Sequence, residues 1–356
     1  MRYNKIDNMK ALLIFSVVLG HLCEIVHFNG SYTLYMFIYV FHMPAFALCS
    51  GLFASFHPKK IFKNLVFPYV IFQSLYILFS HFVLDSSKKI EYTTPYWLMW
   101  YLFAMILWEC AIPLLETTKR STKLLWLGTA TAISLLAGYF GKISYFLSLS
   151  RILVLFPFFV AGFYLRKSHL FPYLAGQKTN KKYNAAKLIS SILAAIVVIV
   201  LFNYRAVINS KWLYGSYSYD KLDYNIFIRA GFMGCAAIIT VFLMVNMPGK
   251  EIPLITNAGR HTFPIFILHG FFIKLFSHYK LFSSSAYPEL VTLAAAIILV
   301  LILSSRPVGR LVQPLMHPDF SHIRSRIHML YMAQHHVYAS DDKGKDESGK
   351  SIYQHS

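Results

Sequence analysis

The segment LISSILAAIVVIVLFNY, residues 188–204, carries no charged side chain and decides the class of fold. An α-helix rises about 1.5 Å per residue, so about 20 such residues cross the ~30 Å hydrocarbon core of a bilayer. Nine further apolar segments are spread along the 356 residues, which predicts an all-α polytopic membrane protein with about ten transmembrane helices. The predicted spans are roughly 11–28, 33–55, 65–84, 96–115, 124–141, 149–165, 188–204, 226–247, 262–279 and 288–304.

The composition excludes a soluble globular protein. Hydrophobic residues make up 56% of the chain and charged residues 14%, whereas soluble domains carry about 25% charged residues. The basic residues that give the formal net charge of +19 lie in short clusters between apolar segments, so we expect no nucleic-acid partner. The four cysteines lie inside apolar segments without the paired spacing of metal ligands, so we expect neither a metal site nor disulfides.

The distribution of Lys and Arg predicts the orientation in the membrane. With ten spans and a cytoplasmic N-terminus, 24 of the 34 basic residues fall on the cytoplasmic side and eight on the other. Cytoplasmic loops of membrane proteins carry the excess of basic residues. We therefore predict a multi-pass protein of the inner (plasma) membrane with both termini in the cytoplasm.

Three regions are predicted along the chain. Residues 1–310 form the ten-helix membrane domain. Residues 311–340, rich in His and Arg with some apolar spacing, are expected to lie at the cytoplasmic membrane surface. Residues 341–356 form a polar tail that is expected to be disordered.

The first span carries the densest set of ionisable groups. At about 100° per residue, Asp7, Lys10, His21 and Glu24 share one stripe of a helix, which a lipid-facing helix would not keep. His21 suits proton transfer near neutral pH, and Glu24, one turn later, is placed to orient its ring. The alternative for His21 is a packing histidine that bonds a neighbouring carbonyl group.

Other polar candidates lie in later spans. The second span contains His42 and Ser50, although Pro44 and Gly51 beside them are also common packing devices in membrane helices. Glu109 and Lys274 are also candidates for a functional role. The alternative for both is that they only pair with polar groups of other helices. The remaining candidates are Trp97, Arg151, Arg229 and His269.

The loop of residues 205–225 is rich in aromatic and polar side chains, among them Trp212 and Tyr214. Such a loop can stack on a sugar ring, but aromatic residues also gather at membrane interfaces without binding anything. The sequence alone leaves both readings open.

Four separated motifs resemble the acyltransferase 3 family of membrane-bound acyltransferases, especially its fucose 4-O-acetylase-like branch. They are DNMK to VVLGH (7–21), FHMP to SG (41–51), SRI to PFFVAG (150–162) and GRHTF to LHG (259–270). They occur in order and over about 260 residues, so together they are far more specific than any one motif alone.

The resemblance implies an O-acetyltransferase that moves an acetyl group from acetyl-CoA to a hydroxyl of a carbohydrate. The acceptor would be a lipid-linked or cell-surface glycan such as O-antigen, capsule or exopolysaccharide, with no permanently bound cofactor. His21 matches the histidine that is generally taken as catalytic in this family, and we expect Glu24 to support it. Lys10 stands where many members have arginine, and lysine cannot form a bidentate contact with phosphate.

On this basis we assign two groups of binding residues. Lys10, Lys59 and Lys60 are expected to hold the phosphates of acetyl-CoA. His42, Ser50, Trp97, Arg151 and His269 are expected to contact the substrate. The competing hypothesis is a secondary transporter or glycan-lipid flippase with His21, Glu24 and Glu109 as a proton relay, although we detect no internal repeat of the kind such proteins contain.

Overall fold

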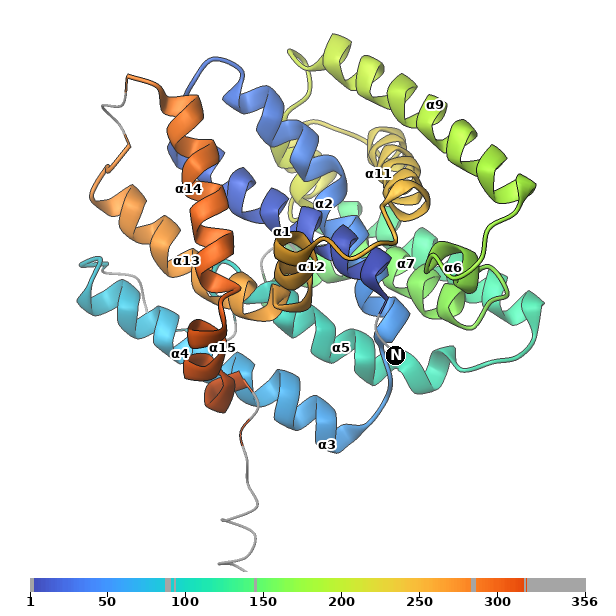
Figure 1. Cartoon of the computed structure of the whole chain (residues 1–356), viewed down its shortest axis with the longest axis horizontal. Coiled ribbons are helices and arrows are strands. Elements are labelled where there is room, and N and C mark those ends of the chain that lie inside the picture. The colour runs from blue at the N-terminus through green and yellow to red at the C-terminus, as the bar shows by residue number, and fades with distance from the viewer. Residues whose placement is uncertain are drawn as a thin grey trace, which may run out of the picture.

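The computed structural model describes residues 3–86, 91–92, 94–143, 146–282, 286–316 and 318, and in these residues it contains helices and no strand. The helices pack into one bundle (Figure 1), which confirms the predicted all-α fold. The long helices are α1 (Asn4–Ile25), α2 (Ser31–Phe53), α4 (Phe67–Phe82), α5 (Trp100–Leu115), α6 (Arg120–Leu136), α7 (Leu149–Arg166), α9 (Lys181–Tyr204), α11 (Ile226–Asn246), α13 (Thr262–His278) and α14 (Pro288–Leu303).

Shorter helical pieces connect and flank the long helices. A π-helical turn (Phe62–Val66) joins α3 to α4 without a break. A 3₁₀ turn, η5, lies inside the loop between α9 and α11. These short elements are α3 (Pro58–Ile61), α8 (Phe171–Leu174), η5 (Ser210–Tyr214), α10 (Tyr219–Leu222), α12 (Pro253–Arg260) and α15 (Arg306–Met316).

Six of the helices are long and apolar enough to cross a membrane, so the chain is a multi-pass membrane protein. The bent pair of α14 and α15 adds a seventh if it counts as one span. Each of the ten predicted spans overlaps a long helix, but α5, α6, α13 and α14 have only 16 or 17 residues. Such helices rise about 25 Å, less than the ~30 Å of hydrocarbon. Length and composition by themselves therefore support six or seven spans rather than ten.

The first helix begins earlier than predicted, at Asn4 instead of residue 11. The polar side chains of its first turns are buried because they form hydrogen bonds with other parts of the protein. Lys5 Nζ donates to the carbonyl of Val245 at 2.9 Å, and Asn8 Nδ2 donates to the carbonyl of Pro248 at 2.9 Å. A search for apolar segments misses this start because the partners come from residues some 240 positions away.

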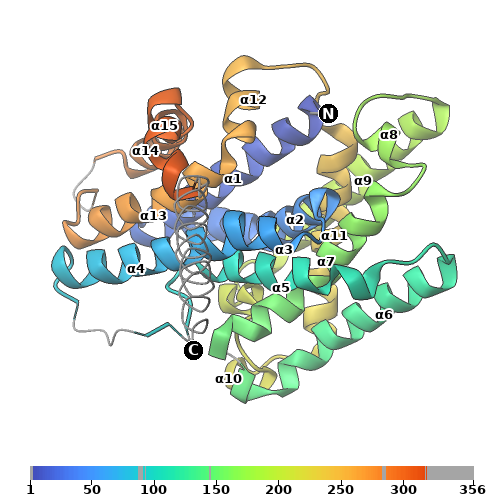
Figure 2. The same cartoon turned by 90° about the horizontal axis from the view of Figure 1, so that it is seen from below.

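α1 lies at the centre of the bundle, and Figure 2 shows it running through the middle of the molecule. It packs against α2, α11, α12, α13 and α14. In its most apolar window 78% of the residues are buried, against 22% for α9, which lies at the edge. The central position explains why α1 can carry its polar stripe, since protein and not lipid surrounds it.

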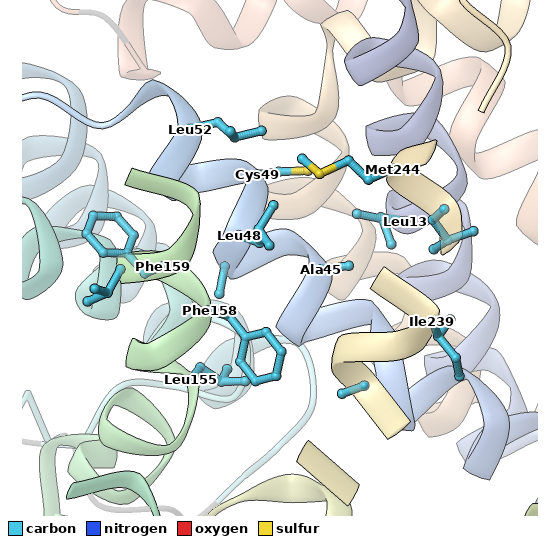
Figure 3. Packing of buried hydrophobic residues seen from close by; sticks show 14 of the residues in the cluster. Leu13, Ala45, Leu48, Cys49, Leu52, Leu155, Phe158, Phe159, Ile239 and Met244 are labelled. Carbon is cyan, nitrogen blue, oxygen red and sulfur yellow. The ribbon is translucent and has the colours of Figure 1, made fainter. Parts of the chain in front are cut away.

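The helices α2 and α7 cross at very short distance in the core. A side chain on Gly51 would overlap the backbone of Phe159, and one on Gly162 would overlap the backbone of Leu48. The two helices therefore touch backbone to backbone, as small residues permit in membrane helices. Around them Leu48, Leu52, Phe158 and Phe159 belong to one apolar cluster (Figure 3), whose α2 residues lie beside the candidate site.

The C-terminal part of the described chain turns sharply. α15 bends by 65° away from α14 and buries Val312 and Met316. The helix α15 includes residues 311–316, which are the start of the predicted surface segment 311–340. Apart from residue 318, the rest of that segment and the polar tail 341–356 lie outside the described residues, so both remain predictions.

Candidate active site

His21 lines a cavity of about 250 Å³. α1, α2, α7 and α11 form its walls, together with the turn before α5 and the loop before α11. We call it the His21 cavity. It brings together residues that the sequence analysis singled out in separate parts of the chain, which are His21, Glu24, His42, Trp97, Arg151, Trp212, Tyr214 and Arg229.

Glu24 holds the ring of His21 from one side. The two lie one turn apart on α1, and His21 Nδ1 is 3.1 Å from Glu24 Oε2. The other carboxylate oxygen, Oε1, accepts hydrogen bonds from the hydroxyls of Tyr35 at 2.8 Å and Tyr39 at 2.9 Å. A carboxylate only accepts hydrogen bonds, so Nδ1 carries the proton and Nε2 of the neutral ring keeps its lone pair.

Two more histidines lie close to His21, and both bond their own helix. His42 Nδ1 donates to the carbonyl of Ile38 at 2.7 Å, and His269 Nδ1 donates to that of Ile265 at 2.9 Å. The ring of His269 stacks on that of His21 with centroids 5.6 Å apart. His269 is fully buried behind His21 and is not part of the cavity lining, so its contact with the cavity runs through the ring of His21.

Trp97 contacts His21 from the turn before α5. The ring centroids lie 4.7 Å apart at an interplanar angle of 60°. The backbone of Trp97 has a φ of +36°, a value that L-residues with bulky side chains rarely adopt. Its indole therefore reaches the cavity through a conformation that the surrounding structure must maintain.

The aromatic loop, residues 205–225, folds over the His21 cavity and is tied to α7. Ser150 Oγ donates to the carbonyl of Gly215 at 2.6 Å, and Arg151 Nε donates to the hydroxyl of Ser216. The guanidinium of Arg151 also lies over the rings of Trp100 (5.3 Å) and Tyr214 (5.9 Å). Arg151 thus positions the loop as well as lining the cavity.

Arg229 of α11 fixes the same loop from the other side. Its side chain is 4% exposed and donates to the carbonyl of Tyr217 at 3.0 Å, to the hydroxyl of Tyr224 and to the carbonyl of Ser134 on α6 at 3.2 Å. Carbonyl groups and the rings of Tyr219 and Tyr224 surround this buried cation. Arg229 also lines the His21 cavity.

Tyr214 connects the loop to the His21–Glu24 pair. Its hydroxyl shares a hydrogen bond with that of Tyr35, which in turn donates to Glu24. Burial raises the pKa of Tyr214 above its usual value, so its hydroxyl stays protonated at neutral pH. The loop, α2 and α1 therefore share one hydrogen-bonded chain from Tyr214 to His21.

A second cavity, of about 270 Å³, lies next to Lys10. We call it the Lys10 cavity. Its lining is mainly apolar, and its polar groups include Lys10, Ser50, Tyr101 and Glu109. Lys10 Nζ pairs with Asp7 Oδ1 at 2.8 Å, and the hydroxyls of Ser50 and Tyr101 are 2.9 Å apart. The predicted stripe of α1 thus divides into the Asp7–Lys10 ion pair beside the Lys10 cavity and the hydrogen-bonded His21–Glu24 pair beside the His21 cavity.

The two cavities share part of their walls. Val17, Met43 and Phe266 line both of them. Val17 lies one turn before His21 on α1, and Met43 follows His42 on α2. We call these three residues the partition, because their apolar side chains are what the two cavities have in common.

The structure does not bring Lys59 and Lys60 to this site. Both lie exposed on α3, and neither lines the Lys10 cavity. Lys10 and Ser50 do line it, and the other predicted residues lie at or directly behind the His21 cavity.

Sequence reasoning missed the tyrosines that hold Glu24. Tyr35, Tyr39 and His42 are spaced by four and three residues, so they share one face of a helix, and that spacing was the available signal. Phe266 and the part played by Arg229 in holding the loop had no comparable signal, because both depend on which helices are neighbours. Among the described residues, no group of three or more His, Cys, Asp or Glu is arranged to hold a metal ion.

Comparison with known proteins assigns the family. No curated protein and no solved structure matches the chain. A family model described as an acyltransferase domain matches residues 3–305, which include every helix from α1 to α14 and both cavities. With its paired carboxylate and imidazole inside a membrane bundle, the chain belongs to the acyltransferase 3 family.

Proposed function

We propose that the protein is a membrane O-acetyltransferase that moves an acetyl group from acetyl-CoA to a hydroxyl of a cell-surface polysaccharide or lipid-linked glycan. One observation carries the proposal. The imidazole of His21, whose Nδ1 is held by Glu24, lies one helical turn from the partition between two cavities of different chemistry. A transfer between two substrates that enter from different sides needs such an arrangement.

The Lys10 cavity suits the donor. Its apolar wall fits the acyl-pantetheine arm of acetyl-CoA, and the ammonium of Lys10 supplies a cation for a phosphate group. A volume of about 270 Å³ takes the arm alone, so the nucleotide would remain outside. In the orientation that the basic residues predict, this cavity faces the cytoplasm, where acetyl-CoA is made.

The His21 cavity suits a carbohydrate acceptor. The indoles of Trp97, Trp100 and Trp212 and the ring of Tyr214 line it, beside the guanidinium of Arg151. Aromatic faces combined with a few polar groups are the usual composition of a site that orients a polar ring. In the same orientation this cavity belongs to the outer half of the membrane domain, where surface glycans are modified.

The direct reaction needs one base. Nε2 of His21 removes the proton from an acceptor hydroxyl, whose oxygen attacks the thioester carbonyl carbon. The tetrahedral intermediate collapses, the carbon–sulfur bond breaks, and the proton on Nε2 passes to the leaving thiolate of CoA. Glu24 stabilises the imidazolium that exists between these steps.

The covalent route uses the same residue as a nucleophile. Nε2 attacks the thioester carbonyl carbon, the carbon–sulfur bond breaks, and CoA leaves as the thiolate, while the acetyl-imidazolium keeps its Nδ1 proton. The acceptor hydroxyl then attacks the acetyl carbon, the carbon–nitrogen bond breaks, and the proton of the hydroxyl neutralises the CoA thiolate. A chemical quench of the protein with labelled acetyl-CoA and no acceptor separates the two routes, because only the covalent one leaves label on His21.

Acetyl transfer by the purified protein in liposomes tests the function. Thiol release from acetyl-CoA is followed together with the transfer of labelled acetyl groups to extracted cell-envelope glycan. We expect His21→Ala to lower transfer by about 10²–10⁴-fold, which is the usual contribution of a general base. The matched control is His27→Ala, because His27 is exposed just after α1 and lines neither cavity.

Two outcomes would contradict the proposal. Full transfer by a folded His21→Ala protein would remove His21 from the chemistry. A wild-type protein that neither binds acetyl-CoA nor labels any glycan would favour the transporter hypothesis, and flux of glycan lipid across the same liposomes would then be measured.

A further inference from the structure

The proposed reaction gives no chemical role to the partition, although the partition lies where the reaction would take place. Its three side chains, Val17, Met43 and Phe266, are apolar and line both cavities. A thioester held in the Lys10 cavity can meet a hydroxyl in the His21 cavity only where the two cavities adjoin. The partition therefore contacts the group that is transferred.

The Lys10 cavity runs along α1 and α2 and ends at the partition. Lys10 and Val17 are seven residues apart on α1, and Ser50 and Met43 are seven apart on α2. At 1.5 Å per residue each wall covers about 10 Å between its polar residue and the partition. A donor arm that occupies this length has its thioester at the partition, and the acyl group has no room to fold back beside the arm.

The ring of Phe266 is held in place from both sides. It lies between the rings of Tyr101 and His269, with centroids 5.8 Å and 6.4 Å away. Both neighbours are themselves hydrogen-bonded, Tyr101 to the hydroxyl of Ser50 and His269 to the carbonyl of Ile265. Phe266 therefore cannot turn away without displacing residues that are fixed by other contacts.

Val17 and Met43 close the partition from α1 and α2, and they differ in flexibility. Val17 is 4% exposed, and a β-branched side chain in a helix keeps essentially one χ1 rotamer. Met43 is unbranched with three rotatable bonds, and it is partly buried against two apolar clusters of the core. Of the three side chains, Met43 is thus the one that can change conformation at small cost.

We propose that the partition is the binding subsite for the acyl group and restricts the protein to short acyl donors. The inference rests on the proposed function. Met43 moves aside so that the thioester carbonyl meets the acceptor hydroxyl, while the methyl group of acetyl packs against Val17 and Phe266. A longer acyl chain would have to push these two side chains apart or occupy the space of the acceptor.

The test compares donors of different acyl length in the liposome assay. Transfer to extracted glycan is measured with acetyl-, propionyl- and butyryl-CoA. We expect kcat/KM of the wild type to be at least about tenfold lower for propionyl-CoA than for acetyl-CoA, the usual effect of one methylene that a pocket does not fit, and lower again for butyryl-CoA. Binding of CoA without an acyl group, followed by calorimetry, should be the same in every variant.

The propionyl-to-acetyl ratio of kcat/KM is the diagnostic quantity. Phe266→Leu makes the partition smaller and should raise this ratio about tenfold, to near unity. Phe263→Leu is the matched control, because Phe263 lies about one turn earlier on α13 and lines the Lys10 cavity but not the His21 cavity. It should leave the ratio at its wild-type value. A thermal melt of each variant shows that it is folded.

Met43→Ile tests the movement of this side chain separately from its size. Isoleucine has a similar volume but is β-branched and stiff at χ1. We expect kcat for acetyl transfer to fall several-fold, while the KM for acetyl-CoA and the propionyl-to-acetyl ratio stay near their wild-type values. An unchanged kcat in Met43→Ile would overturn the movement that we assign to Met43.

The outcomes separate this inference from the proposed function. Equal kcat/KM for acetyl- and propionyl-CoA in the wild type, or an unchanged ratio in Phe266→Leu, would overturn the acyl subsite while leaving acyl transfer established. A rise of the ratio in Phe263→Leu as large as in Phe266→Leu would overturn it as well. If none of the three donors labels any glycan, the proposed function itself fails and the acyl subsite fails with it.

Discussion

The His21 cavity and the Lys10 cavity share α1 and α2 as walls and yet differ in chemistry. Along α1 the lining changes from Lys10 through apolar residues to His21 and Glu24, and along α2 it changes from Ser50 to Tyr39. The first cavity is rich in hydrogen-bonded aromatic residues, whereas the second is mainly apolar. The difference shows that a few turns of helix are enough to separate a polar, aromatic cavity from a mainly apolar one, which we propose as the acceptor site and the donor site.

The largest effect is expected when the contact between Glu24 and His21 is removed and the Lys10 cavity is left unchanged. Glu24→Gln removes the charge that stabilises imidazolium and frees the ring to change tautomer. We expect kcat to fall by about 100-fold with little change in the KM for acetyl-CoA, in line with the effect of losing an orienting partner of a histidine. Steady-state transfer assays with both substrates varied measure the two parameters.

Tyr35→Phe provides the graded control for Glu24, because it removes one of the two tyrosine bonds to Oε1 and leaves the carboxylate. Its effect should lie between those of the wild type and Glu24→Gln. Equal activity of Glu24→Gln and the wild type would mean that His21 works without an orienting carboxylate.

The second prediction concerns the Lys10 cavity. Lys10→Met removes the cation that we assign to a donor phosphate, and it leaves Asp7 without its partner at 2.8 Å. We expect the KM for acetyl-CoA to rise by about tenfold, since one charge-assisted contact is lost. Binding of CoA itself, followed by calorimetry, should weaken by the same factor.

Lys59 and Lys60 sharpen the same prediction. They are exposed on α3 and away from the cavity lining, so the double variant Lys59→Met, Lys60→Met should weaken CoA binding less than Lys10→Met. A loss as large as that of Lys10→Met would show that the nucleotide reaches α3, as the sequence hypothesis expects.

The smallest effect is expected in the aromatic loop. Replacing both Trp212 and Tyr214 by alanine removes two side chains that line the His21 cavity. The KM for the glycan acceptor should rise several-fold through loss of aromatic contacts, while CoA binding stays constant. Unchanged acceptor kinetics would restrict the loop to a structural role at the membrane interface.

The sequence predicted the helices of this fold well, but it predicted poorly which helices lie next to one another. Each apolar segment became a helix because hydrocarbon forces the backbone to satisfy its own hydrogen bonds. The stripe on α1 correctly placed His21 beside Glu24 and Lys10 beside Asp7, since both pairs lie within one turn. Local periodicity suffices for contacts of this kind.

The sequence could not predict the contacts between helices, and the reason is physical. Hydropathy shows that a polar residue avoids lipid, but it does not show which helix shields it. The stacking of His269 on His21 joins residues nearly 250 positions apart, and Trp97 reaches His21 from a short turn with an unusual backbone angle. The burial of the first turns of α1 was missed for the same reason.

The partition of Val17, Met43 and Phe266 has a consequence for the energetics of the membrane. A path that ran as open water from one cavity to the other would conduct protons and dissipate the membrane potential. Three apolar side chains between the cavities impose a desolvation cost on any ion. A neutral acetyl group bears no such cost, so the protein would pass a carbonyl group between two aqueous compartments while the bilayer stays electrically sealed.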